Sequence, residues 1–284
     1  MIASTSPPPS PRTTLSQWVR GCLAILLLAA AGPVRAETPV DLELVLAVDV
    51  SLSMDIEEQA LQRGGYIAAF RDPLIHKAIK SGPGGRIAVI YIEWAGPPSQ
   101  QVVIPWTLID GPEAARAFAD KLEAQPISRL RMTSISSALI FSGRELDRNS
   151  FKGLRRVIDV SGDGPNNSGP PVTPIRDELV GKGVVINGLP VLLRPSNSGF
   201  FDLTNLDEYY KDCVIGGPGS FMIPIRERKE FAEAIRQKLI LEISGILSAP
   251  RILPAQAAAP TPKPTDCMIG EQMWRRYYDG VIRN

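Results

Sequence analysis

Histidine and cysteine are scarce in this sequence, with one and three residues among 284. Zinc and copper sites are usually built from these side chains, so their scarcity argues against both metals. The single histidine, His76, lies in the segment DPLIHKAI near the expected end of a helix, and we interpret it as a surface or structural residue. A catalytic triad that depends on histidine is therefore not expected, and the nucleophile motif G-x-S-x-G is absent.

An excess of positive charge is also missing. Residues 1–36 hold three arginines and no acidic residue, and the rest of the chain has 28 basic and 30 acidic residues, a net charge of −2. Nucleic acid and anionic lipid are bound by clusters of basic residues, so neither is expected as a partner. The segments GPGG and GGPGS precede predicted strands, whereas a phosphate-binding loop follows a strand and opens a helix, so we interpret both as turns.

The first 36 residues have the layout of a secretory signal peptide. Arginines without acidic residues accompany the apolar stretch CLAILLLAAAG, and a small residue precedes Glu37. The apolar stretch has about half of the roughly 20 residues that span a bilayer, which favours a cleaved signal over a membrane anchor. We therefore predict a periplasmic or secreted protein without stable membrane insertion after cleavage.

Cleavage would remove Cys22 and leave two cysteines, Cys213 and Cys267. In an oxidising compartment an even pair of cysteines predicts one disulfide. Two free, buried thiols are the alternative.

The apolar pattern beyond the signal alternates strands and helices. Strands are predicted at residues 42–50, 86–94, 100–108, 154–161, 184–192 and 220–225, and helices at 55–70, 112–122, 134–146, 172–181 and 227–243. The connection AGPPS between the second and third strands is too short for a crossover, so these two strands must pair as an antiparallel hairpin. The pattern predicts a doubly wound, Rossmann-like α/β domain whose sheet is mostly parallel with one antiparallel edge strand.

The predicted domain covers residues 40–247, and two shorter segments follow it. Residues 248–265 contain five prolines within APRILPAQAAAPTPKPT and indicate an extended linker. Residues 266–284 return to an apolar pattern with Met273, Trp274, Tyr277 and Val281. We expect this tail to dock on the domain and to be held there by Cys267.

Oxygen-bearing side chains cluster at the predicted carboxyl ends of the strands, where doubly wound sheets bind ligands. Asp49 ends the first strand and is followed at alternate positions by Ser51 and Ser53. The segment DVSGDG ends the fourth strand, and Thr133 enters a helix between the two. Carboxylates and hydroxyls are ligands of hard cations, so the pattern predicts a site for Mg²⁺, with Mn²⁺ or Ca²⁺ as alternatives.

The motifs DVSLS, MTSISSAL and VSGDG, in this order, resemble the metal-ion-dependent adhesion site of von Willebrand factor type A domains. The resemblance implies Asp49, Ser51 and Ser53 as first-loop ligands, Thr133 as the second-loop ligand and Asp163 as the third-loop ligand. It also implies a protein partner that offers an acidic side chain to the cation. The signal sequence, GGYIAAFRDP and VIDVSGDGPNN further resemble a bacterial family of exported A-domain-like proteins of unknown function.

Two positions depart from the family pattern. Met132 stands where the family usually has glycine, and SGDG replaces the commoner TDG. The second departure leaves open whether Asp159 or Asp163 faces the metal, although Asp159 lies inside an apolar run and is typical of a buried structural carboxylate.

Two other function classes fit parts of the pattern. A haloacid-dehalogenase-like, Mg²⁺-dependent phosphatase also uses an aspartate at the end of its first strand, but it needs a second acid where this chain has Ser51. A structural envelope protein with a non-functional metal site would keep the motif without binding. We expect a cation-dependent protein-binding module and no enzyme.

Overall fold

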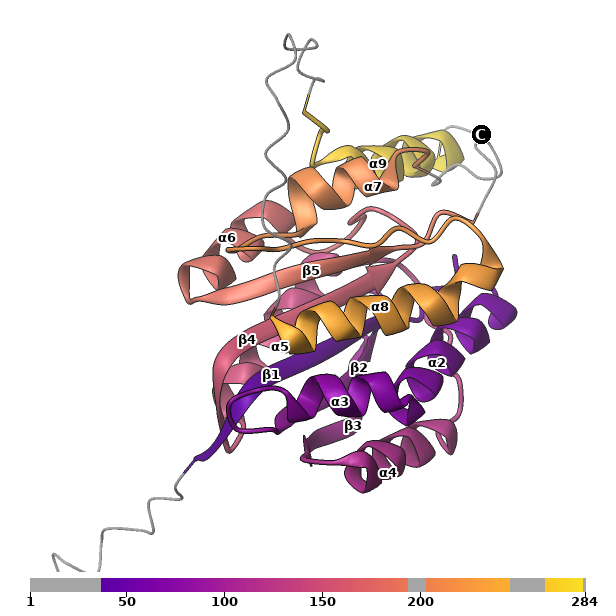
Figure 1. The fold of residues 1–284 in the computed structure, drawn as a ribbon. Helices are drawn as coiled ribbons and strands as arrows, with labels where there is room; N and C mark the ends of the chain where they lie inside the picture. The colour runs from indigo at the N-terminus through magenta and orange to yellow at the C-terminus, as the bar shows by residue number, and fades with distance from the viewer. Residues whose placement is uncertain (1–36, 194–202, 246–263, 283–284) are drawn as a thin grey trace, which may run out of the picture. The chain divides into compact units, whose positions relative to one another are not determined.

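The computed structural model describes residues 37–193, 203–245 and 264–282 (Figure 1). The predicted signal peptide at residues 1–36 and most of the linker predicted at 248–265 lie outside these ranges. Within them, none of the helices has the length and apolar character needed to cross a membrane.

A five-stranded sheet forms the centre of the domain, in the order β3-β2-β1-β4-β5 (Figure 1). Its strands are β1 (Thr38–Asp49), β2 (Ile87–Trp94), β3 (Gln100–Ile109), β4 (Phe151–Gly162) and β5 (Val184–Pro190). All neighbours run parallel except β2 and β3, which pair antiparallel at the edge. The predicted fold class and the predicted antiparallel hairpin are both confirmed.

The central strand β1 is apolar on both faces because helices cover both sides of the sheet. Leu44 and Leu46 point into one core, whereas Val45 and Ala47 point into the other. The first core is closed by the helices α2 (Ile56–Arg71), α3 (Pro73–Lys80), α4 (Pro112–Glu123) and α8 (Phe231–Ser244). The second is closed by α5 (Ile135–Arg148), α6 (Val172–Gly181), α7 (Leu206–Tyr209) and a π-helical turn, η1 (Tyr210–Val214).

Helix α3 is an element that the sequence analysis missed. The Asp72 side chain caps it by accepting a hydrogen bond from the Leu74 amide at 2.7 Å, and Pro73 occupies the first turn, where its missing N–H removes no helical bond. His76 lies within this helix, is buried, and forms a 2.8 Å hydrogen bond with the Phe70 carbonyl. This contact agrees with a structural role for the histidine.

The last predicted strand, at residues 220–225, is wrong as a regular strand. The segment runs parallel to β5 and forms only isolated bridges, between Gly188 and Met222 and between Val191 and Ile225. The amides of Gly188 and Leu192 donate to this segment, but Pro190 between them has no N–H to donate, so the ladder lacks one hydrogen bond. The helix predicted at 227–243 begins with a 3₁₀ turn, η2 (Arg228–Glu230), before α8.

The C-terminal tail forms a helix, α9 (Ile269–Ile282), and belongs to the same compact unit as the sheet. Cys267 forms a disulfide with Cys213 of η1, with a Cα–Cα distance of 5.5 Å, so the predicted pairing is present. Met273 and Trp274 are half-buried, while Tyr277 is exposed.

Candidate metal centre

The first loop of the candidate site begins where β1 ends. The Ser51 amide donates a 2.7 Å hydrogen bond to Asp49 Oδ1, which folds the chain back over the end of the strand. The Ser51 and Ser53 hydroxyls lie 2.7 Å apart, as expected for alternate residues that turn towards one point. Helix α2 then starts with a capping box, in which Asp55 and Glu58 exchange hydrogen bonds with each other's backbone amides.

The third loop follows β4, the strand next to β1. Val48 of β1 pairs with Ser161 of β4, so the two strands end side by side. The Ser53 hydroxyl donates a 2.6 Å hydrogen bond to Asp163 Oδ1. The structure therefore brings Asp49, Ser51, Ser53 and Asp163 together through one chain of contacts.

The second loop joins the site through the third. Thr133 is buried, its amide donates to Asn167 Oδ1 at 3.0 Å, and its carbonyl accepts from the Asn167 amide at 2.9 Å. The Ser168 hydroxyl donates to the same carbonyl at 3.2 Å. The side chain and the backbone of Asn167 therefore hold in place the threonine that the motif assigns to the site.

Met132 adopts a left-handed backbone conformation, with φ of 69°, and it is the one non-glycine residue with positive φ in the described ranges. This conformation is unfavourable for residues with a Cβ atom and normal for glycine. The departure from the family pattern at this position therefore has a physical meaning: the loop keeps the glycine geometry without the glycine.

Asp49 is fully buried and its Oδ2 atom has no hydrogen-bond partner among the described residues. Burial, followed by the negative charge of Asp163, raises the pKa of the Asp49 carboxyl well above its usual value. Two carboxylates and adjacent hydroxyls, with one buried oxygen left unpaired, fit a hard divalent cation. The described residues contain no group of three or more histidine, cysteine, aspartate or glutamate side chains that would indicate another kind of metal site.

The hydroxyl of Tyr210, in η1, lies close to the Asp49 carboxylate, and no pattern in the sequence indicated this residue. A methyl group added to Gly162 would lie 2.8 Å from Asp49 Oδ2 and 3.0 Å from the Tyr210 hydroxyl, so both atoms face the same point. The hydroxyl is buried and has no hydrogen-bond partner in the described structure. Burial, followed by the charges of Asp49 and Asp163, raises the pKa of Tyr210, so the phenol remains protonated and able to donate.

Asp159 lies away from this group of oxygens. Its carboxylate forms a 2.6 Å ion pair with Lys238 of α8 and accepts a 3.4 Å hydrogen bond from the Tyr66 hydroxyl. The geometry therefore assigns Asp159 to a buried ion pair and leaves Asp163 as the third-loop carboxylate that contacts Ser53.

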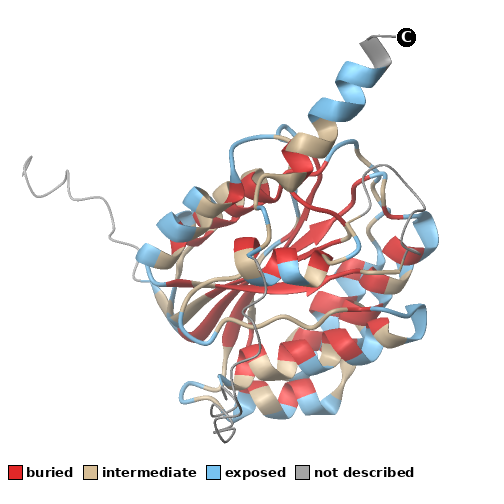
Figure 2. Ribbon diagram, turned by 90° about the horizontal axis from the view of Figure 1, so that it is seen from above, coloured by how far each residue is buried: buried red, intermediate tan, exposed pale blue. Residues whose placement is uncertain are grey.

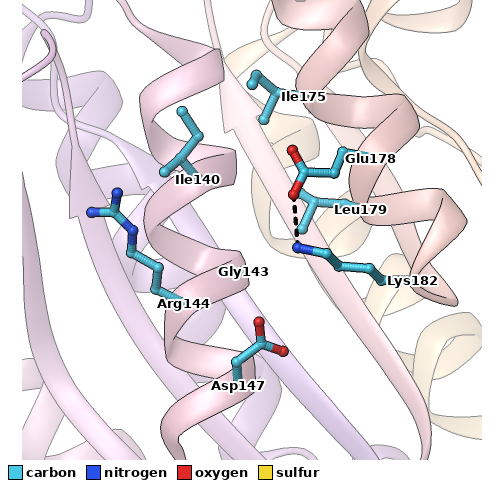
Figure 3. A pocket seen from close by; sticks show the side chains of 8 residues that line it. All are labelled: Ile140, Gly143, Arg144, Asp147, Ile175, Glu178, Leu179 and Lys182. Carbon is cyan, nitrogen blue, oxygen red and sulfur yellow. Dashed lines mark hydrogen bonds and ion pairs between the residues drawn. The ribbon is translucent and has the colours of Figure 1, made fainter.

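A separate groove of about 330 Å³ lies between α5 and α6 (Figure 3). Its walls contain apolar side chains such as Ile140 and Ile175, and Lys182 pairs with Glu178 at its rim. It includes none of the candidate metal ligands.

Comparison with solved structures identifies the fold. The pilus adhesin SpaC from Lactobacillus rhamnosus GG is similar at a TM-score of 0.55 with 12% identity, covering 73% of this chain and 31% of that one. The proximal thread matrix protein 1 of the mussel byssus gives 0.50 and 12%, covering 73% and 48%. A von Willebrand factor type A protein from Catenulispora acidiphila gives 0.50 and 17%, covering 72% and 43%.

This chain therefore spans less than half the length of each of those three structures. The likeness shows a fold of the von Willebrand factor type A kind. No curated protein is a significant match. The family model described as "Protein of unknown function (DUF1194)" matches residues 39–247, most of the chain, and the protein belongs to that family.

Proposed function

We propose that this protein is an exported module that binds a divalent cation, Mg²⁺ first among the candidates, and through it an acidic side chain of a protein partner. The ligands are Asp49, Ser51, Ser53, Thr133 and Asp163. The fold supports the proposal because similar domains occur in a pilus adhesin and in a byssus matrix protein.

The observation that carries the proposal is the unpaired Oδ2 atom of Asp49. A buried carboxylate that has one unpaired oxygen and lies close to a second carboxylate is costly to keep in a folded protein. A cation at this point would balance both charges and use the hydroxyls of Ser51 and Ser53 as further ligands. Since only a few protein oxygens reach the site, one coordination position is left for a partner's carboxylate.

The test is the thermal midpoint of the chelator-stripped protein during titration with Mg²⁺, Mn²⁺ and Ca²⁺, beside the variant Asp49→Asn. A ligand that binds the native state raises stability, by about 2.7 kcal/mol at one hundred times its Kd. The variant removes one of two neighbouring charges, so we expect a higher metal-free midpoint than in the wild type and no response to cations. A folded wild type that responds to none of the three cations would contradict the proposal.

Turnover separates the proposed module from a phosphatase. The binding module predicts cation-dependent capture of a partner without hydrolysis, whereas a phosphatase predicts Mg²⁺-dependent release of phosphate from a generic phosphate ester. A structural envelope protein with a non-functional site predicts neither cation binding nor hydrolysis.

A further inference from the structure

The C-terminal tail lies directly against the third loop of the candidate site. A methyl group added to Gly270 would come within 2.1 Å of the Asn166 backbone oxygen, so α9 begins in contact with that loop. The next residue, Glu271, is buried, and its Oε1 accepts a 2.7 Å hydrogen bond from Asn166 Nδ2. Both contacts fall on a residue three positions after Asp163.

Asn166 connects this contact to the rest of the site. Its Oδ1 accepts hydrogen bonds from the amide and the hydroxyl of Ser136 at 3.1 and 3.2 Å, at the start of α5. Its Nδ2 donates to the Pro170 carbonyl at 3.1 Å as well as to Glu271. Every donor and acceptor of this buried amide is used, so the side chain has one orientation. Its neighbour Asn167 bonds Thr133, so the loop that Glu271 fixes also fixes the second-loop ligand.

The disulfide links the same tail to η1, the turn that contains Tyr210. Cys267 bonds Cys213, which shares the π-helical turn η1 with Tyr210. The Thr265 amide also donates a 2.9 Å hydrogen bond to Asp212 Oδ2 in that turn. The tail thus contacts both the third loop and the turn whose tyrosine lies beside Asp49.

These contacts are confined to the beginning of the tail. Residues 275–280 of α9 are exposed, and Figure 2 shows the pale blue end of this helix extending away from the buried red core. A helix that served only to cover the core would bury an apolar face along its length. Here the burial is concentrated at Gly270 and Glu271, against the site.

We propose that the segment 264–282 is a clamp: it holds the third loop and the turn η1, with Tyr210, in place and thereby sets the cation affinity of the site. Glu271 and Asn166 are positioning residues in this arrangement, and the disulfide keeps the clamp closed. The inference rests on the proposed metal binding and extends it to residues beyond the matched family region, which ends at 247.

The experiment measures the Kd for Mn²⁺ by calorimetry on the purified, chelator-stripped protein and on six variants. Loss of residues that orient metal ligands typically weakens affinity 10- to 100-fold, and we expect about tenfold for Glu271→Ala. Glu271→Gln removes the charge but keeps an oxygen that can accept from Asn166, so its Kd for Mn²⁺ should lie within about twofold of the wild-type value. If the charge of Glu271 were what mattered, this variant would bind Mn²⁺ as weakly as Glu271→Ala.

Gly270→Ala and Gly280→Ala form the matched pair. Both place the same methyl group in the same helix, where alanine is favoured over glycine by about 1 kcal/mol. At Gly270 the methyl would meet the Asn166 oxygen, whereas at Gly280 it would meet nothing within 4 Å. We expect weaker Mn²⁺ binding for the first and an unchanged Kd for the second.

The double variant Cys213→Ser/Cys267→Ser opens the clamp without a change at the loop. We expect a weakened Mn²⁺ affinity here too. Adding Glu271→Ala to the double cysteine variant should weaken Mn²⁺ binding less than Glu271→Ala does in the wild type, because both changes act on the same segment. The clamp is overturned if Glu271→Ala, Gly270→Ala and the double cysteine variant all bind Mn²⁺ as tightly as the wild type. A wild type that binds no cation overturns the proposed function and the clamp with it.

Discussion

Two buried acidic clusters lie near the end of β4, and they balance their charges differently. In the first, Asp159 and Glu242 share Lys238 as a common cation, and Asn187 donates a 2.9 Å hydrogen bond to Glu242. We call this the lysine cluster. In the second, the candidate metal centre, no lysine or arginine of the described structure pairs with Asp49.

The difference separates a structural cluster from a functional one. Charges that a folded chain balances with its own side chains need nothing from outside and hold elements together, here α8 against the sheet. A buried carboxylate whose charge no lysine or arginine balances lowers the stability of the folded protein. Such carboxylates are usual at sites that bind a ligand. The comparison predicts that removing the lysine from the first cluster destabilises the protein, whereas removing the Asp49 charge from the second stabilises the metal-free protein.

The largest expected effect is in the lysine cluster. Lys238→Met leaves Asp159 and Glu242 buried without a cation, and removing one partner of a buried ion pair typically costs about 3–5 kcal/mol. Urea unfolding should show this loss in the free energy of unfolding. Lys182→Met is the matched control, because Lys182 also pairs with a glutamate one helical turn away, but on the surface. It should leave stability unchanged, and equal effects of the two variants would break the comparison.

A second test uses the proton that the lysine cluster takes up. Burial, followed by the charge of Asp159, raises the pKa of Glu242 to about 7, although Lys238 acts in the opposite direction. Because the folded pKa lies above the unfolded value, the native state binds more protons, and Glu242 lowers stability as the pH rises from about 4.5 through 7.

The variant Glu242→Gln removes this titration and keeps an oxygen for Asn187 and Lys238. Its stability relative to the wild type should increase with pH across the window from 4.5 to 7, by roughly 3 kcal/mol, since one unit of pKa shift corresponds to about 1.4 kcal/mol. Urea midpoints at several pH values measure the difference. A constant difference between variant and wild type would show that Glu242 does not titrate in this range.

The sheet and the adjacency of the first-loop and third-loop residues could be predicted because they follow from local patterns. The apolar run before Asp49 marks a strand buried on both faces, and parallel strands bring their carboxyl ends to one edge, where Asp49 and Asp163 meet. The position of Asp159 inside an apolar run likewise indicated a buried structural carboxylate, and its ion pair with Lys238 agrees with that interpretation.

The parts that could not be predicted depend on contacts distant in sequence. Tyr210 reaches the site through a π-helical turn, and no periodic pattern marks such a turn. The contact of Asn166 could not be recognised in the sequence because its partner, Glu271, belongs to the tail. Helix α3 was missed since eight residues are too few for a clear period, although its cap, Asp72, was visible.

The smallest expected effect is on stability and concerns the backbone conformation beside the candidate metal centre. Here the two clusters are compared by backbone strain and not by charge. The lysine cluster is built on a regular helix and strand, whereas the candidate metal centre includes Met132 at φ of 69°. A left-handed conformation costs a residue with a Cβ atom roughly 1 kcal/mol relative to glycine. Met132→Gly should therefore be more stable than Met132→Ala by about that amount in urea unfolding, because alanine keeps the strain and both lose the same partly exposed side chain. Equal stability of the two variants would mean that the loop relaxes without cost, and the second loop would then be no more strained than the lysine cluster.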